Sequence, residues 1–200
     1  MSTPISIHQR TYATEAFDEG GDVMRVHGRL VDTKPFGLTL SDGGLLVIHD
    51  MVLDLFVDSN SFEIVGVEAD MDVHPYQLYT AVLASDQQLV GVSIARGYSR
   101  KVRELFGGPN GYSHLGSLLL AMGPVAVQAS WSLGNLHRDP IELVENTTDP
   151  IERERQLSMN VNTCHVWRED GENITNIRQG NRPSLPNWEV GRLRELGVEV

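Results

Sequence analysis

Apolar and polar residues alternate along much of the first seventy positions, and this period of two predicts β-strands. The clearest case is DVMRVHGRLVD at 22–32, where Met24, Val26 and Leu30 share one side and basic side chains occupy the other. We therefore expect one face of this strand to be buried and the other to meet solvent.

Two further β-rich runs, 45–57 and 62–71, are separated by the turn-forming DSNS at 58–61. This order predicts an antiparallel hairpin. The apolar face expected for the second run consists of Val65, Val67, Ala69 and Met71.

The spacing of apolar residues then changes to that of helices. We expect one helix at 76–90, a second at 98–106, and a third that follows Ser113 as its N-cap. Pro124 is expected to kink the third helix or end it early. The apolar residues at helical spacing in the third helix are Leu115, Leu118, Leu119, Met122, Val125, Ala126 and Ala129.

After the third helix the pattern is weaker. Residues 132–150 predict a long connection, 152–158 a short charged helix, and NVNTCHVW at 160–167 a strand that returns to the sheet. We expect a loop-like segment at 171–188 and a small final helix at 189–198.

Strands first and helices afterwards predict an α+β fold, in which helices cover one face of a largely antiparallel sheet. A chain of 200 residues suits one domain plus an appended tail. We place the domain at 1–170 and the loop-rich tail, with its short helix, at 171–200.

Composition and charge restrict the partners. Hydrophobic residues make up 40% of the chain, enough for a core, and the net charge of −11 disfavours binding to nucleic acid or anionic lipid. No apolar run approaches the roughly 20 residues that span a bilayer. No signal peptide is visible, and the single cysteine, Cys164, excludes an internal disulfide. We expect a cytoplasmic protein that acts on a small molecule, with no nucleic acid or membrane partner; homo-oligomer formation stays open.

The stretch LFGGPNGYSHLGSLLLAM at 105–122 combines a glycine-rich loop with the start of an apolar helix. Gly108 and Gly111 would let main-chain N–H groups approach an anion at the helix N-terminus, and Arg100 and Arg103 would clamp it. The spacing of a P-loop is absent. A plain turn followed by a capped helix is the alternative interpretation.

His114 begins that helix, where the local positive potential favours a neutral imidazole that can act as a base or ligate a metal. Asp72 and His74 precede Pro75 at a strand-to-helix corner, with Tyr76 beside them as a substrate contact. If the corner faces the helix start, Asp72 is the carboxylate partner of His114 and His74 a second ligand. The structural alternatives are a cap for Asp72 and an exposed histidine without a role for His114.

Several other candidates carry a structural explanation beside a functional one. His49 and Asp50 are adjacent on a strand and face opposite sides, so we expect His49 in the core with a main-chain partner and Asp50 in solvent. Cys164 and His165 also face opposite ways and cannot share one metal without a bend. The DTKP sequence at 32–35 is interpreted as a turn, and its lysine stays a candidate for the mouth of a site.

Six segments occur in a fixed order: DTKPF at 32–36, IHDM at 48–51, VEADMDVHPY at 67–76, LVGVSIARGYSRKVRELFGG at 89–108, GYSHLGSLL at 111–119 and NTCHVW at 162–167. Together they resemble the bacterial family catalogued as domain of unknown function 2889, over about residues 8–170. The resemblance implies no particular activity, although we associate the family with catabolic surroundings.

A hairpin, a corner, a helix and a glycine-rich loop in this order are also similar in architecture to the iron–sulfur cluster assembly scaffolds. The cysteines of those scaffolds fall, by position, near Pro75, Phe106 and His114, and none of these is cysteine. Because clusters need thiolate ligands, the similarity implies a pocket and not cluster assembly.

The leading hypothesis is a small enzyme with lyase or hydrolase chemistry on a small organic catabolic substrate, which is either anionic or neutral. Asp72 and His114 would be catalytic, and the cofactor is either absent or a divalent metal held by His74 and His114. The alternative is a non-enzymatic module that binds a metal or a partner protein. The sequence leaves open whether the protein is an enzyme and whether the tail docks on another chain.

Overall fold

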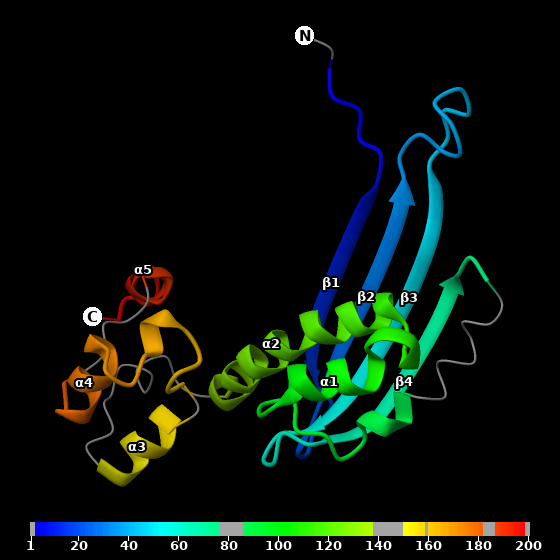
Figure 1. Cartoon of the computed structure of the whole chain (residues 1–200). Coiled ribbons are helices and arrows are strands. Elements are labelled where there is room, and N and C mark those ends of the chain that lie inside the picture. Colours follow the sequence, from blue (N-terminus) through cyan, green and yellow to red (C-terminus); the bar gives the residue numbers. More distant parts are fainter. Residues whose placement is uncertain (1–2, 77–85, 138–149, 159, 182–186, 199–200) are drawn as a thin grey trace. The chain divides into compact units, whose positions relative to one another are not determined.

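The structure is a computed structural model that describes residues 3–76, 86–137, 150–158, 160–181 and 187–198 (Figure 1). The chain divides into two compact units, Met1–Gly134 and Asn135–Val200. This division falls well before the boundary that the sequence pattern suggested after residue 170.

The first unit contains a four-stranded antiparallel sheet in the order β1-β2-β3-β4, in which each strand pairs with the one that precedes it in sequence. The predicted strand at 22–32 is confirmed as β2, and the predicted hairpin as β3 and β4. The strands are β1 (Gln9–Asp18), β2 (Val23–Lys34), β3 (Leu46–Asp58) and β4 (Ile64–Val73).

The predicted alternation of faces holds in β2, where Met24, Val26 and Leu30 are buried. It fails at one position of β4. Phe56 of β3 pairs with Gly66 and the next residue pairs with Ile64, so Val65 is an extra residue at a β-bulge and is exposed. The prediction for Val65 was wrong because a bulge turns the side chains beyond it to the other face of the sheet.

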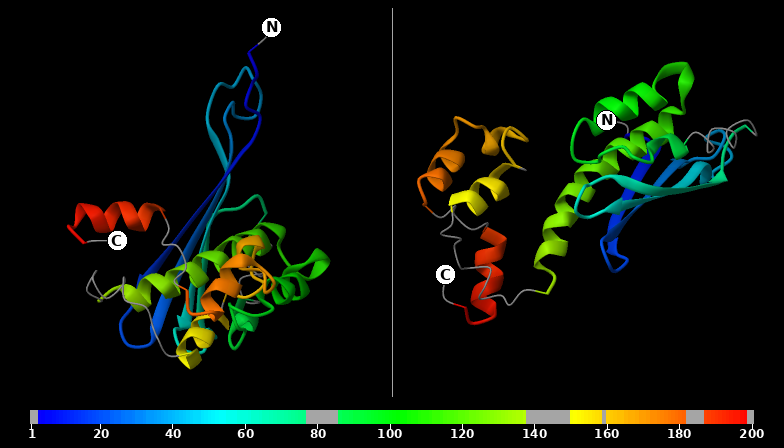
Figure 2. Two further views of the ribbon diagram at one scale, coloured as in Figure 1. Left: turned by 90° about the vertical axis from the view of Figure 1, so that its left-hand side faces the viewer. Right: turned by 90° about the horizontal axis from the view of Figure 1, so that it is seen from below.

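Two helices, α1 (Tyr98–Phe106) and α2 (Ser113–Asn135), cover one face of the sheet, while the strands extend beyond them at one end (Figures 1 and 2). Both helices confirm the prediction. Gly28 of β2 allows α2 to approach closely, because a Cβ there would lie 2.6 Å from the sulfur of Met122. The residues by which α2 joins the common core are Leu115, Leu118, Leu119, Met122 and Ala126.

Pro124 lies inside α2, and the helix continues to Asn135. Of the two predicted effects of this proline, a kink or an early end, the early end was wrong. Pro124 is exposed, on the side of α2 that faces away from the sheet. The missing main-chain hydrogen bond at Pro124 therefore does not interrupt the helix.

By length and composition alone, α2 also qualifies as a helix that could cross a membrane, which the sequence analysis did not expect. Its residues Leu118, Leu119 and Met122 are fully buried against the sheet. A helix at the core of a folded unit meets the same criterion.

Between β4 and α1, most of the helix predicted at 76–90 falls on residues 77–85, which lie outside the described residues. Of the described residues in this range, 86–89 form one 3₁₀ turn. Beyond it, Ser93 forms an isolated antiparallel bridge with Glu63. The segment at 86–94 therefore runs beside the start of β4.

The second unit is built from short helices: α3 (Pro150–Ser158), the 3₁₀ helix η3 (His165–Trp167), α4 (Glu172–Arg178) and α5 (Asn187–Glu195). The charged helix and the final helix are confirmed by α3 and α5. The strand predicted at 160–167 was wrong, since this segment forms turns and η3, and the loop predicted at 171–188 contains α4.

The second unit has a hydrophobic cluster of its own, which explains why residues 150–170 belong to it and not to the first unit. Leu157 of α3 packs with Ile174 and Ile177 of α4, and Val161 and Trp167 lie against them. This cluster joins residues on both sides of position 170. The apolar positions Val161 and Trp167 therefore reflect packing on α3 and α4, and not a strand of the sheet.

Candidate metal centre

Asp32 lies near the end of β2 and is fully buried. It has the same parity as Val26 and Leu30, so its side chain points to the helix-covered face of the sheet. Arg10 is its partner across the β1–β2 pair. Arg10 Nε donates to Asp32 Oδ1 and Nη2 donates to Oδ2, both at 2.6 Å. A charged group without exposure is tolerated because this bidentate pair compensates it.

His49 of β3 is the partner of Asp32 on the other side of β2. His49 Nδ1 lies 3.0 Å from Asp32 Oδ2. Because an ionised carboxylate only accepts hydrogen bonds, Nδ1 carries the hydrogen in this arrangement. The strand register thus aligns Arg10, Asp32 and His49 in one row across three strands.

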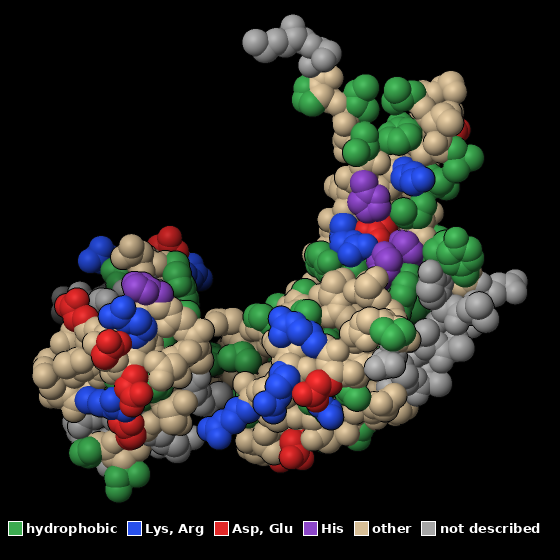
Figure 3. Space-filling view, in the orientation of Figure 1, with side chains coloured by type: hydrophobic (Ala, Val, Ile, Leu, Met, Phe, Trp, Pro, Cys, Tyr) green, Lys and Arg blue, Asp and Glu red, His purple; other side chains and the backbone are tan. Residues whose placement is uncertain are grey.

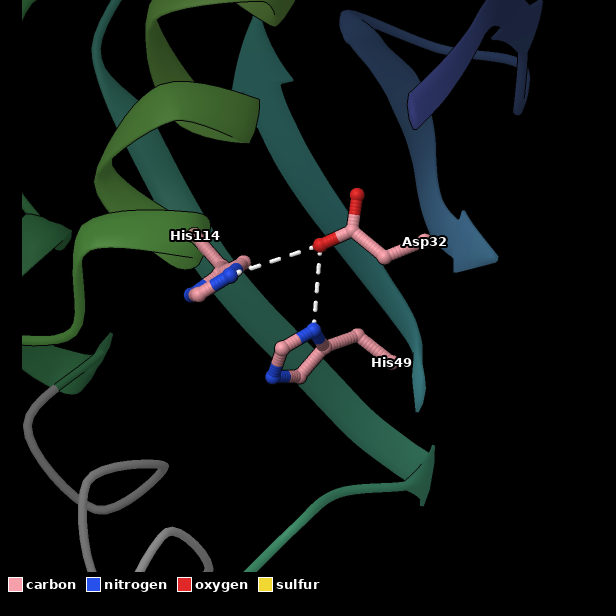
Figure 4. A group of neighbouring side chains, drawn as sticks. All are labelled: Asp32, His49 and His114. Atoms are coloured by element: carbon pink, nitrogen blue, oxygen red, sulfur yellow. Dashed lines mark hydrogen bonds and ion pairs between the residues drawn. The ribbon is translucent and has the colours of Figure 1, made fainter. Parts of the chain in front are cut away.

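His114 reaches the same carboxylate from the first turn of α2. Its Nε2 lies 3.4 Å from Asp32 Oδ2, and its ring centroid lies 4.0 Å from that of His49 (Figure 4). The ring of Tyr112 lies 4.7 Å from the ring of His114. Two imidazoles from different elements therefore converge on a single oxygen.

The group opens toward solvent on the side of its histidines. The side chain of His49 is 11% exposed and that of His114 is 20% exposed, whereas Asp32 has no exposure. A third imidazole, that of His8, lies 3.4 Å from the other oxygen of Asp32 and is 45% exposed. In the space-filling view, histidine and basic side chains surround a small acidic patch above the start of α2 (Figure 3).

Two of these groups have displaced pKa values. Burial by itself would raise the pKa of Asp32, but hydrogen bonds and charge from Arg10, with smaller contributions from His49 and His114, lower it to about 2. Burial, together with the charges of His49 and Arg10, lowers the pKa of His114 to about 4. At neutral pH, Asp32 is therefore a carboxylate and His114 a neutral imidazole.

Asp32, His49 and His114 can each present one ligand atom, and these atoms all lie within 4.8 Å of one another. Ligands of a tetrahedral metal bound at 2.0–2.1 Å are separated by about 3.4 Å, close to the 3.0 and 3.4 Å seen here. Arg10 uses one lone pair on each oxygen of Asp32, and a metal would take the second lone pair on Oδ2 in place of the hydrogen of His49 Nδ1. The donor set of two imidazoles and one carboxylate fits a divalent transition metal.

The acid that meets His114 is Asp32 and not Asp72, contrary to the sequence hypothesis. Val73 pairs with Asp50 and Met71 pairs with Met51, so Asp72 is the extra residue at a second bulge of β4. Asp72 is exposed. Its charge adds a small contribution to the pKa of Arg29, which is raised mainly by the hydrogen bond with Asp50, and the Arg29 side chain lies on the face away from the helices. The alternation of β4 turns Asp72 away from α2.

The other residues predicted at the corner lie apart from this group. His74 Nδ1 contacts the main-chain oxygen of Tyr76, and the Tyr76 side chain is exposed. Among the described residues, the group of three potential ligands contains neither of them. The predicted role of His74 as a metal ligand beside His114 is not supported by this arrangement.

Arg100 and Arg103 interact within α1. Arg100 Nε lies 3.7 Å from a carboxylate oxygen of Glu104, and Arg103 Nη1 donates to the main-chain oxygen of Ser99. Both arginines are exposed. The structure therefore does not bring this predicted substrate clamp to His114.

The glycine-rich loop has a structural explanation. Gly108 adopts a positive φ of 58° at the start of the 3₁₀ turn η2 (Gly108–Asn110). Gly111 passes so close to the main chain of Phe106 that a Cβ would overlap it. These glycines let the chain turn tightly from α1 into α2, and this turn sets the position of His114.

Of the remaining candidates, only His49 belongs to the group. It is buried as predicted, but its partner is the carboxylate of Asp32 and not a main-chain group. Asp50 lies on the opposite face and pairs with Arg29. Cys164 and His165 are exposed in the second unit, at the start of η3.

Sequence reasoning assigned Asp32 to a turn and left Arg10 unremarked. One signal was present in the sequence: Asp32 continues the parity of Met24, Val26 and Leu30, so it is a carboxylate on a face that is otherwise apolar. A charged residue at such a position needs a buried partner. No local pattern could show that the partner is Arg10.

A family model described as "Protein of unknown function (DUF2889)" matches residues 8–128, more than half of the chain. The match includes Arg10, Asp32, His49 and His114, and it ends before NTCHVW at 162–167, so it is shorter than the resemblance suggested. No curated protein and no solved structure matches the chain. The architectural similarity to iron–sulfur scaffolds therefore gains no support.

Proposed function

Because the chain belongs to the DUF2889 family, whose function is not assigned, we propose a function from the site itself: the protein binds a divalent metal at Asp32, His49 and His114 and uses it in lyase or hydrolase chemistry. The observation that supports this proposal is the convergence of three ligand groups, from β2, β3 and α2, on one point that is shielded from most of the solvent.

The ionisation of the ligands favours metal binding at neutral pH. Metal ligands must be deprotonated, and the pKa values of about 2 for Asp32 and about 4 for His114 mean that both already are. The hydrogen on His49 Nδ1 lies between the ring and Asp32 Oδ2, where a metal would lie. A metal bound at Nδ1 would therefore require the other tautomer of His49, with the hydrogen on Nε2, and this change releases no net proton.

Among the described residues, a group of three ligands favours catalysis over a structural role. Structural zinc sites usually have four protein ligands, whereas catalytic sites have three and keep a position for water or substrate. A metal held in this way lowers the pKa of its water or polarises a carbonyl oxygen. Arg10 holds the plane of the Asp32 carboxylate, and Tyr112 packs on the His114 ring, so the chain's own residues orient the ligands.

The experiment that tests metal binding uses the full chain, purified without a histidine tag and stripped with a chelator. Titration with Zn²⁺, Mn²⁺ or Co²⁺ should show one tight site. The His114→Ala variant should bind at least about tenfold more weakly, because one of three ligands is lost. His27→Ala is the matched control, since His27 also pairs with an aspartate, Asp54, but has its side chain on the opposite face.

Turnover separates an enzyme from a binding module. The zinc-loaded protein should hydrolyse 4-nitrophenyl acetate faster than the stripped protein, and His114→Ala should abolish the difference while His27→Ala keeps it. Tight binding without any metal-dependent turnover would favour the non-enzymatic alternative. Equal affinity of the wild-type and His114→Ala proteins would contradict the metal site.

A further inference from the structure

The charges around the three ligands nearly cancel before any metal arrives. Among the described residues, Asp32 is the one carboxylate of the ligand group, and its charge is balanced by the guanidinium of Arg10 at 2.6 Å. Histidines bind metals as neutral imidazoles. A divalent metal at this site would therefore carry close to its full charge of +2.

This charge balance differs from that of a site with two or three carboxylates, where the protein itself neutralises the metal. Asp32 is fully buried and Arg10 is only 30% exposed, so water screens the excess charge weakly. A further nitrogen base, His8 on the segment before β1, lies on the Oδ1 side of Asp32. Figure 3 shows the same arrangement, with basic and histidine side chains around a small acidic patch.

We infer that the metal-loaded site takes a small oxyanion, a carboxylate or phosphate group of the substrate, as its fourth ligand, because Arg10 already balances the charge of the carboxylate in the ligand group. This inference rests on the proposed metal site and adds the class of substrate. The overall charge of −11 does not oppose it, because the field at the anion is set by the groups within a few ångströms.

The arginine is central to this inference. The positive charge of Arg10 should weaken metal binding, because it repels the cation, and it should strengthen anion binding. Removing its charge should change the two affinities in opposite directions. A purely structural role for Arg10 would instead weaken both, because the carboxylate would lose its orientation.

The test uses Co²⁺ as the bound metal, because its visible absorption responds to a change of ligand. Acetate and inorganic phosphate are added at constant ionic strength, with acetamide as the neutral analogue of acetate. At least one of the two anions should cause a saturable spectral change with an affinity at least about tenfold higher than that of acetamide. The anion that binds more tightly tells whether the substrate carries a carboxylate or a phosphate.

Arg10→Gln should bind Co²⁺ more tightly and the preferred anion about tenfold more weakly. Arg29→Gln is the matched control, because Arg29 makes the same two-point contact with Asp50 on the opposite face and should change neither affinity. If Arg10→Gln does not fold, the affinities of the Co²⁺-loaded wild-type protein for acetate and acetamide are sufficient to test the inference.

The outcomes separate the two proposals. Failure of Co²⁺ to bind overturns the metal site and this inference with it. Tight Co²⁺ binding with equal affinities for acetate and acetamide, and no response to phosphate, overturns the inference and leaves the metal site intact.

Discussion

The candidate site depends on Asp32, because four other side chains lie within 3.4 Å of its two carboxylate oxygens. Its burial costs free energy, and Arg10 and His49 compensate for that cost only while Asp32 is ionised. The carboxylate therefore contributes to stability as well as to chemistry.

We predict that Asp32→Asn destabilises the protein by about 2 kcal/mol at pH 7. The pKa of Asp32 is about 2 in the folded protein and 3.8 ordinarily, so its stabilising effect is present above pH 4 and is lost as the pH falls toward 2. The cost of the substitution should shrink over that range. Urea unfolding of both proteins at several pH values measures it.

Asp50→Asn is the control for this measurement. Asp50 also forms a two-point pair with an arginine, but Arg29 is half exposed, so the loss should stay below about 1 kcal/mol. A cost for Asp32→Asn no larger than that for Asp50→Asn would show that burial adds nothing at Asp32.

Asp86 is a second buried carboxylate, and neither of its oxygens accepts a hydrogen bond within the part of the chain that the structure describes. Burial raises its pKa from 3.8 to about 7. The folded state therefore binds a proton more tightly than the unfolded state, and stability should fall as the pH rises from 4 to 7.

We predict that Asp86→Asn removes this loss. The variant should match the wild type below pH 4 and exceed it by up to about 4 kcal/mol above pH 7, in thermal or urea unfolding. A constant difference between the two proteins across this range would show that the side chain does not titrate in the fold as its burial implies.

The turn between α1 and α2 connects local structure to the site, because it sets where α2 begins and hence where His114 lies. Gly111 is its most constrained residue, since a side chain there would overlap main-chain atoms of Phe106, which cannot move aside as a flexible side chain can.

We predict that Gly111→Ala lowers stability by roughly 2 kcal/mol and weakens metal binding, because the start of α2 must shift. Gly134→Ala, in the last turn of the same helix with open space around it, should raise stability by up to about 1 kcal/mol and leave metal binding unchanged. Equal metal affinity for Gly111→Ala and the wild type would argue that the turn does not position His114.

The division of the whole chain into two compact units has a direct consequence. The hydrophobic core of the sheet and its helices contains residues of the first unit only, and the cluster around Leu157 contains residues of the second. The family match at 8–128 and the complete ligand group both lie in the first unit.

We predict that a chain ending after His137 folds and binds metal with the affinity of the full chain. Circular dichroism, thermal unfolding and a Co²⁺ titration of the two proteins test this. Loss of metal binding by a shortened chain that still folds would show that the second unit contributes to the site.

Local sequence patterns were sufficient for most of the secondary structure of the first unit. The period of two in β2 and the helical spacing of Leu115, Leu118 and Leu119 reflect burial of one face, which a single segment records by itself. In the second unit the pattern predicted α3 and α5 but was misleading at 160–167 and at α4. Short helices such as α4 depend on neighbours for their stability more than on their own periodicity.

The residues of the site could be predicted only in part. His114 was recognised because its chemistry follows from its place at the start of a helix. His49 was expected on the apolar face, but as a core residue with a main-chain partner and not as a partner of a carboxylate. The carboxylate partner of His114 could not be recognised, because Asp32 and Asp72 are equivalent by residue type. A strand pattern tells which face a side chain takes, but not which residue of the next strand lies beside it. The pairing of β1, β2 and β3 and the bulge at Asp72 decide that alignment through long-range hydrogen bonds, so the tertiary structure alone selected Asp32.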